Sequence, residues 1–291
     1  MCTAINFNGY FGRTLDYECG FGEEATLVRR DTVLHLRHRK SITTAYSVGG
    51  MARVENGYPL FFDAMNEKGL AMAGLNFVGN AYYPRGDDGD IAVFELIPYV
   101  LSQAATVKEA EGLIMDTRIV DTPFSRDMPT ASLHWLIGDR ENTLTVESTE
   151  NGLSVYTNPT GVLTNNPPFP YQLAYLNNFL NLTPLPAENR FSHSMDIVPV
   201  SRGMGAIGLP GDWSSPSRFV RAAFVRENAT KEKSAEHFFR IMSSVSVPKG
   251  CMILENGDSE YTRYTSCMDL ENGIYYFSRY ENHGIKALSV I

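Results

Sequence analysis

The 291-residue sequence predicts an α+β fold in which layers of antiparallel sheet are flanked by helices. Asn-Gly pairs recur between alternating apolar segments, and this pair favours the tight turn of a β-hairpin. Predicted strands are grouped with strands and helices with helices, without the alternation that produces a parallel sheet. No run rich in proline, glycine, serine or charge divides the chain, so we expect a single domain over residues 1–291.

Alternating apolar residues locate the strands of this fold. A hairpin is predicted at the start of the chain, where Asn8-Gly9 joins residues 2–7 to residues 10–16. Two meanders are predicted further along the chain. Their strands span residues 131–138, 143–149, 153–157, 260–269, 274–280 and 285–290.

Helices are predicted between these groups of strands. Thr106 and Glu109 form a capping box in front of an apolar stripe, which marks the start of a helix. Apolar residues recur at helical spacing over residues 235–242. Two further helices are predicted over residues 92–104 and 217–227.

Composition and charge exclude several classes of function. The formal net charge is −8 with scattered Lys and Arg, so nucleic acid is not an expected partner. No apolar stretch has the length of a signal peptide or a membrane span, so we expect a cytoplasmic protein without a membrane partner. There is no glycine-rich turn between a strand and a helix, and the six histidines are scattered. We therefore expect no cofactor and no metal.

The second residue, Cys2, carries the strongest chemical signal in the chain. Removal of Met1 would place a thiol and a free α-amine on one residue. An unperturbed α-amine has a pKa of about 7.7 to 8.0, so part of it is neutral near pH 7 and can take the thiol proton. The resulting thiolate attacks carbonyl carbon. Cys2 therefore predicts an N-terminal nucleophile, although this residue taken alone also fits a chance cysteine.

The predicted hairpin returns its second strand toward Cys2 and brings Arg13 and Asp16 with it. A guanidinium near a thiol favours the thiolate, and a carboxylate can hold and orient the amine. The two residues also fit an ordinary surface pair three positions apart. The pattern favours an activated nucleophile and leaves the surface pair open.

Six segments in order along the chain extend this signal from Met1 almost to Ile291. They are MCTAINF, FGRTLDYE, NEKGLAMAGLNF, GVLTNNPPF, GLPGDWSSPSRF and YTSCMDLENGIYYF. Together they closely resemble the choloylglycine hydrolase family, the bile salt hydrolases and penicillin V acylases. This resemblance implies a four-layer αββα sandwich, the fold of N-terminal-nucleophile hydrolases. It also implies hydrolysis of an amide between a bulky carboxylic acyl group and an amine.

The resemblance also assigns site residues. The catalytic positions that match are Cys2, Arg13, Asp16, Asn76, Asn165 and Arg218. Asn76 occupies a position where bile salt hydrolases carry asparagine and many penicillin acylases carry tyrosine, so conjugated bile salts are the expected substrates. Taken alone, Asn165 fits an ordinary turn and Arg218 fits a surface position at a helix start.

The expected chemistry is acyl transfer through a thioester. Attack on the amide produces an oxyanion, which the Asn76 side-chain amide and the Asn165 backbone N–H can stabilise by about 3 kcal/mol each. The protonated amine of Cys2 then gives its proton to the departing nitrogen. Glycine or taurine leaves, and water activated by the amine releases the bile acid from the thioester.

A steroid acyl group needs an apolar cleft. Leu15 and Phe21 match cleft-lining positions of the family, and we expect the same of Phe61, although all three fit a plain core equally well. The loops over residues 77–90 and 120–130 carry apolar side chains that suit either a ligand or a subunit interface. The family tends toward homotetramers, so a homo-oligomer is expected.

Three further expectations concern specificity. Residues 201–203 resemble a family loop linked to the choice between conjugates, and they favour glycine weakly. The hairpin joining Cys2 to Arg13 is several residues shorter than is usual in the family, which could alter the cleft entrance. The rival functions are a penicillin V acylase or another N-acyl amide hydrolase and, without catalysis, a protein that binds bile acids or lipids.

Overall fold

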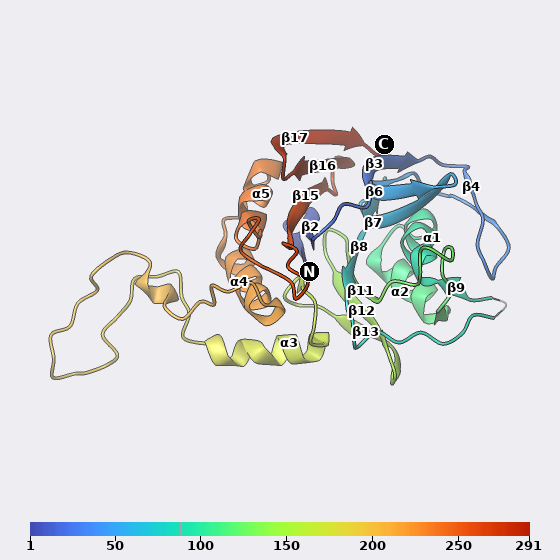
Figure 1. Cartoon of the computed structure of the whole chain (residues 1–291). Helices are drawn as coiled ribbons and strands as arrows, with labels where there is room; N and C mark the ends of the chain where they lie inside the picture. The colour runs from blue at the N-terminus through green and yellow to red at the C-terminus, as the bar shows by residue number, and fades with distance from the viewer. Residues whose placement is uncertain (88) are drawn as a thin grey trace.

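Two antiparallel sheets stacked face to face form the centre of the protein in a computed structural model, which describes residues 1–87 and 89–291 (Figure 1). The first sheet has the strand order β14 (Val162–Leu163), β1 (Cys2–Phe7), β2 (Tyr10–Tyr17), β15 (Tyr261–Asp269), β16 (Ile274–Arg279) and β17 (Asn282–Ser289). The second has the order β13 (Gly152–Thr157), β12 (Thr143–Thr149), β11 (Leu133–Gly138), β8 (Ala71–Asn76), β7 (Tyr58–Asn66), β6 (Val48–Glu55) and β3 (Glu24–Val28).

Helices cover the outer face of each sheet. Their bounds are α1 (Leu96–Gln103), α2 (Val107–Met115), α3 (Phe169–Tyr175), α4 (Ser215–Asn228) and α5 (Ala235–Ser243). In Figure 1, α4 and α5 lie outside the first sheet, and α1 and α2 lie outside the second. The predicted αββα layering is confirmed. None of the helices in the described residues is long and apolar enough to cross a membrane.

Short elements connect these layers. They are β4 (Val33–Leu34), β5 (Ile42–Thr43), β9 (Ile91–Ala92), β10 (Ile119–Val120) and the 3₁₀ turns Val93–Glu95, Leu176–Phe179 and Met204–Ala206. The short strands β9 and β10 pair in parallel, apart from the two large sheets.

The N-terminal hairpin is confirmed in its turn and its register. Asn8 and Gly9 have φ angles of 52° and 84°, which a two-residue hairpin turn requires. Cys2 pairs with Leu15, and Ala4 pairs with Arg13. The turn therefore sets which residues of β2 lie beside the first residue of β1.

The predicted meanders and helices are also confirmed, with small differences at their ends. The segment predicted over 92–104 divides into a 3₁₀ turn and α1, and Pro98 lies in the first helical turn, where its missing N–H is not needed. At α2, Thr106 Oγ1 accepts a hydrogen bond from Glu109 N, but the Glu109 carboxylate accepts from Ala105 N. The Glu109 side chain therefore bonds the residue before Thr106 and not, as the predicted capping box requires, Thr106 itself.

A long segment between α3 and α4 projects from the layers (Figure 1). Its base is closed by the hydrogen bond from Thr183 N to Gly205 O, 3.0 Å long. We call the enclosed residues 184–204 the arm. It exposes apolar side chains, including Phe191 at 84% and Val200 at 90%. The arm buries little of its apolar surface against its own chain.

Candidate active site

Cys2 begins β1 and lies between the two sheets with only 2% of its surface exposed. Its N–H donates to Asn165 Oδ1 over 2.9 Å, and its carbonyl oxygen accepts from Arg218 Nη1 over 2.5 Å. Met1 covers this residue: its ammonium donates to Asp16 O over 2.6 Å and pairs with Glu260. Burial lowers the pKa of the Met1 α-amine, so an amine in this environment is driven toward its neutral, basic form.

Arg13 holds the sulfur of Cys2. Its guanidinium donates to Cys2 Sγ and also to the carbonyl oxygens of Gly74 and Phe62, over 2.7 and 3.2 Å. Burial alone would lower the pKa of Arg13, but nearby groups including Cys2 and Asp63 more than offset this and raise it. The cation at the sulfur is therefore permanent, and it favours the thiolate.

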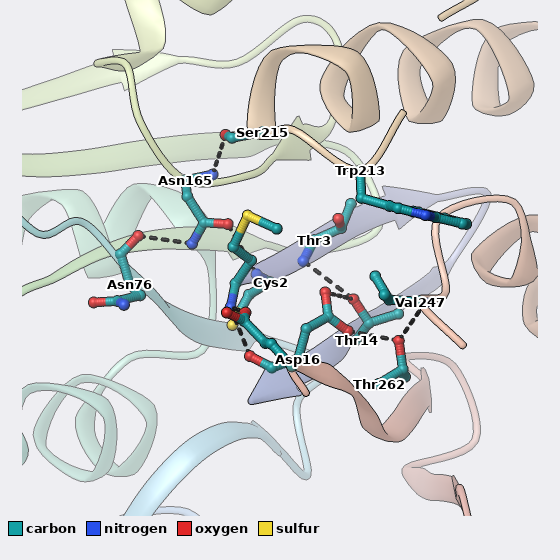
Figure 2. Close-up of polar contacts among 12 residues, drawn as sticks. Cys2, Thr3, Thr14, Asp16, Asn76, Asn165, Trp213, Ser215, Val247 and Thr262 are labelled. Carbon is teal, nitrogen blue, oxygen red and sulfur yellow. Dashed lines mark hydrogen bonds and ion pairs between the residues drawn. The ribbon is translucent and has the colours of Figure 1, made fainter. Parts of the chain in front are cut away.

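Asp16 is buried and receives two hydroxyl hydrogen bonds (Figure 2). Thr262 Oγ1 donates to its Oδ1 over 2.6 Å, and Thr14 Oγ1 donates to its Oδ2 over 3.1 Å. Each hydroxyl is oriented by a backbone N–H, from Val247 to Thr262 and from Thr3 to Thr14. This arrangement turns both hydroxyl protons toward the carboxylate and suits its ionised form.

The contact expected between the Asp16 carboxylate and the nitrogen of Cys2 is not the one found while Met1 is attached. The Cys2 nitrogen donates to Asn165 instead. Asp16 reaches the terminal residue through its main chain, since Asp16 N donates to Met1 O over 2.9 Å. The physical reason is that, with Met1 attached, the Cys2 nitrogen is a peptide N–H with one hydrogen, and Asn165 Oδ1 accepts it.

Asn165 and Arg218 join Cys2 in one hydrogen-bond network. Asn165 Oδ1 accepts from both Cys2 N and Arg218 Nη2, and Asn165 Nδ2 donates to Asn76 O over 2.7 Å. Arg218 is fully buried and also donates to Thr3 Oγ1. Asn165 does lie in a bend and Arg218 at the start of α4, as the alternative interpretations had it, but both side chains are buried, so Arg218 is not a surface residue.

The donor expected from the Asn165 backbone is already occupied. Asn165 N donates to Ser215 Oγ over 2.8 Å (Figure 2), so it is not free for an oxyanion. The side-chain amide of Asn165 has a second N–H beyond the one bonded to Asn76 O. Within the described residues, the side-chain amide of Asn76 makes no hydrogen bond. These two side-chain amides are the donors left at the site.

The apolar residues predicted to line a cleft are divided between two faces of the protein. Leu15 is paired directly opposite Cys2 and belongs to the core between the sheets. Phe21 is half-buried and packs on Phe62, with ring centroids 5.4 Å apart. Phe61 lies on the other side of its sheet, in the core under α1 and α2.

A β-bulge explains the position of Phe61. In β7, Asp63 pairs with Met51 and Phe61 pairs with Ala52, which leaves Phe62 as an extra residue. Simple alternation would place Phe61 on the same side as Asp63. The extra residue turns Phe61 away and presents Phe62 to the core between the sheets. The expectation for Phe61 is corrected: Phe62 is the residue on the side of Cys2.

The two loops named as candidate ligand contacts differ in their packing. Phe124, in the loop over 120–130, packs edge-on against Phe94 and lies under the guanidinium of Arg37. Tyr82, in the loop over 77–90, is half exposed. Residue 88 of that loop lies outside the described residues. The segment 201–203 lies at the end of the arm.

Sequence reasoning missed the two threonines that hold Asp16. Thr14 could have been found, because it lies two residues before Asp16 and shares its face of β2. Thr262 is 246 residues away and comes from β15, so only the strand pairing reveals it. In the described residues, no group of three or more His, Cys, Asp or Glu side chains is placed to hold a metal ion.

A cysteine directly after Met1, placed between the sheets of an αββα sandwich with a buried arginine at its sulfur, is typical of the class of N-terminal-nucleophile hydrolases. Residues 2–291 match the linear amide C–N hydrolases, choloylglycine hydrolase family. The chain belongs to this family.

Individual relatives agree with this assignment. The chain is 44% identical to a bile salt hydrolase/transferase of Lactiplantibacillus plantarum, over 100% of this chain and 92% of the relative. The crystal structure of the C2A mutant of the conjugated bile acid hydrolase from Clostridium perfringens superposes with a TM-score of 0.92 and 34% identity, covering 99% and 92% of the two chains. The penicillin V acylase of Agrobacterium tumefaciens shares the fold, with a TM-score of 0.78 and 21% identity over 99% and 86%.

Proposed function

We propose that this protein, after loss of Met1, hydrolyses the amide bond of glycine- or taurine-conjugated bile salts. The observation that carries the proposal is the environment of Cys2: Arg13 at its sulfur and Asn165 at its nitrogen. The substrate class is supported by the relative that is 44% identical and is named a bile salt hydrolase/transferase.

In the first step, the α-amine of Cys2 takes the thiol proton and the sulfur attacks the amide carbon. The new C–S bond converts the carbonyl oxygen into an oxyanion. The side-chain amides of Asn76 and Asn165 donate to this oxyanion, and each such donor contributes about 3 kcal/mol in comparable sites. Asn165 therefore has two roles: Oδ1 holds the amine that moves the proton, and Nδ2 stabilises the charge that forms.

In the second step, the C–N bond breaks while the ammonium of Cys2 gives its proton to the leaving nitrogen. Glycine or taurine departs as an amine, and the acyl group remains on Cys2 as a thioester. The amine then takes a proton from water, the hydroxide attacks the thioester, and the C–S bond breaks. The bile acid leaves, and Arg13 stabilises the thiolate that is restored.

The remaining site residues hold this machinery in place. Arg218 bonds the carbonyl oxygen of Cys2 and Asn165 Oδ1, so it fixes the nucleophile relative to the amine-binding oxygen. Asp16 is a buried anion that compensates part of the charge of Arg13 and Arg218. Phe21 and Phe62 are partly buried and form the apolar side on which the steroid lies, while the buried Leu15 packs in the core between the sheets.

The test measures glycine and taurine release from their cholate conjugates, with phenoxymethylpenicillin as a parallel substrate. Intact mass first verifies that Met1 is absent from the active protein. We expect conjugate hydrolysis in excess of penicillin hydrolysis, faster release of glycine than taurine, and complete loss in Cys2→Ala. Cys267→Ala, which removes another buried thiol, is the matched control and keeps activity.

Each other outcome selects a different function. Preferential hydrolysis of the penicillin identifies an acylase of the same class. Full activity in Cys2→Ala contradicts the mechanism, and binding of cholate conjugates without turnover identifies a binding protein. An active protein that retains Met1 contradicts the role of the Cys2 amine.

A second activity, acyl transfer to amines, is supported by the word transferase in the names of two relatives. In this reaction an amine replaces water: its nitrogen attacks the thioester, the C–S bond breaks, and the amine's proton passes to the Cys2 α-amine. The product is a new amide. Incubation of a cholate conjugate with an excess of a second amino acid detects this amide by mass spectrometry.

We further propose that residues 1–291 form one domain that assembles as a homo-oligomer in the cytoplasm. The core between the sheets draws on strands from both ends of the chain, which supports one domain. The four cysteines of the sequence are free thiols, which suits a reducing compartment. The exposed apolar side chains of the arm support contact with a second copy of this chain.

A further inference from the structure

A buried pair of titratable side chains lies behind the proposed site and is not used by the proposed mechanism. His134 on β11 and Glu147 on β12 are both buried, with His134 Nδ1 3.0 Å from Glu147 Oε1. His134 Nε2 lies 2.8 Å from the carbonyl oxygen of Thr164. Since that oxygen only accepts, Nε2 carries a proton, and a further proton lies between Nδ1 and Oε1.

The pair contacts both ends of the segment that carries Asn165. His134 binds Thr164 O at the start of this segment. Glu147 Oε1 accepts from Phe169 N, over 2.9 Å, at its end. Asn165 therefore lies in a short stretch of chain, residues 164–169, whose two ends are held by one side-chain pair.

The same imidazole also contacts the residue that follows the other proposed oxyanion donor, Asn76. The ring of His134 stacks on Phe77, with centroids 4.1 Å apart and planes 7° from parallel. Phe77 directly follows Asn76, and Thr164 directly precedes Asn165. One ring thus fixes the neighbours of both side-chain amides. Among the described residues, neither His134 nor Glu147 makes a hydrogen bond to Cys2, Arg13 or Asp16.

Stabilisation of the fold does not by itself explain the His134–Glu147 pair. Glu147 Oε2 is buried and has no hydrogen-bond partner among the described residues. A buried unpaired oxygen destabilises the folded state, and well-packed apolar residues often replace buried ionic pairs without loss. The hydrogen bonds from the His134–Glu147 pair to the main chain of Thr164 and Phe169 are directional, and apolar residues could not supply them.

We propose that His134 and Glu147 are positioning residues that hold the Asn76 and Asn165 amides at the geometry required by the oxyanion. This inference rests on the proposed function, because it concerns the same reaction. The pair acts through the segment 164–169 and through Phe77. Its loss should lower kcat with little change in KM, since substrate binding depends on the apolar side of the cleft.

The test compares His134→Gln with His237→Gln, a matched control. His237 Nε2 also bonds a backbone carbonyl, Thr230 O, but this residue is only half-buried, the bond is exposed, and it lies on α5, away from the site. We expect His134→Gln to reduce kcat about 10- to 100-fold, because small displacements of catalytic groups have effects of this size. KM should change less than about twofold and His237→Gln should match the unsubstituted protein.

A second readout separates positioning from general damage. Alkylation of Cys2 by iodoacetamide, followed by peptide mass spectrometry, needs the thiolate but no oxyanion. Arg13 lies on β2, outside the segment 164–169, so the alkylation rate should stay within about threefold in His134→Gln. A variant whose alkylation and kcat fall together contradicts the inference.

Two further variants keep the inference testable if His134→Gln does not fold. Glu147→Gln retains an oxygen for Phe169 N and should keep more kcat than Glu147→Ala. In an Asn165→Ala background, Glu147→Gln should cause a smaller further loss than it causes alone, because the part of its effect that passes through Asn165 is already absent. Unchanged kcat in both Glu147 variants, or full additivity with Asn165→Ala, overturns this inference and leaves the proposed function unaffected. Absence of turnover in the unsubstituted protein overturns the proposed function and this inference with it.

Discussion

The surroundings of Cys2 and the arm over residues 184–204 differ in the kind of side chain that each buries and exposes. Around Cys2, charged and polar side chains lie in the core between two sheets, and nearly every polar atom has a partner. On the arm, apolar side chains such as Phe191 and Val200 are mostly exposed to solvent. One region buries charge and the other exposes hydrocarbon.

This contrast indicates which property a single substitution changes in each region. In the buried network, removal of one side chain leaves a donor or acceptor unmatched in the core, which costs about 1 to 3 kcal/mol per group. Geometry and stability therefore change together at the site. On the arm the chain's own fold gains little from each side chain, so substitutions act on association with other molecules.

Arg13→Leu should have the largest effect. It removes the cation at Cys2 Sγ and leaves the carbonyl oxygens of Gly74 and Phe62 without this donor. We expect kcat to fall at least about 100-fold and the rate of Cys2 alkylation to fall with it, since both need the thiolate. Arg13→Lys keeps the charge but not the planar fork and should recover only part of the rate.

The control for Arg13 is Arg53→Leu, which changes a half-exposed arginine on β6 that pairs with Glu55. Its activity should be unchanged. Normal alkylation of Cys2 in Arg13→Leu would show that the cation does not activate the sulfur.

Thr262→Val should have the next largest effect. The substitution keeps the shape of the side chain but removes the hydroxyl that donates to Asp16 and accepts from Val247 N. We expect a loss of about 1 to 3 kcal/mol in the free energy of unfolding, measured with urea, and about a tenfold drop in kcat. Thr262→Ser retains the hydroxyl and should recover most of both. Equal behaviour of the two variants would mean that the hydroxyl is not what Asp16 needs.

Sequence alone predicted the parts of this molecule that depend on local pattern. The Asn8-Gly9 turn fixed the register of β1 and β2 and so placed Arg13 and Asp16 near Cys2. The bulge at Phe62 could not be predicted, because it arises from the pairing of β6 with β7 rather than from the sequence of β7. Thr262 and the His134–Glu147 pair were missed for a similar reason: their partners come from other strands and loops.

Asp63 provides a smaller effect that depends on pH. It is buried and accepts hydrogen bonds from the hydroxyls of Tyr264 and Tyr275. Burial raises its pKa above the usual 3.8, against the opposing influence of Arg13 and the two tyrosines. The folded state therefore binds this proton more tightly than the unfolded state. The resulting stability is complete below pH 3.8 and is lost as pH rises through the higher, folded pKa.

Asp63→Asn removes this titration and keeps a side chain of the same shape. The decline in unfolding free energy between about pH 4 and neutrality should therefore be shallower in the variant than in the unsubstituted protein. Urea unfolding at a series of pH values measures both curves, and their difference isolates Asp63 from other titrating groups. Parallel curves would show that Asp63 is ionised in both states.

Phe191→Ser combined with Val200→Ser should have the smallest effect on the single chain and a clear effect on assembly. Both side chains are exposed, so the free energy of unfolding of the monomer should change by no more than about 0.5 kcal/mol. If the arm packs against a second copy, its loss of apolar surface weakens association, and analytical ultracentrifugation should show smaller species at the same concentration. Val54→Ser, at an exposed apolar position on β6, controls for general surface polarity and should leave the assembly intact. An unchanged assembly in the arm variant would remove the arm from the subunit interface and leave its exposed hydrocarbon to a different partner.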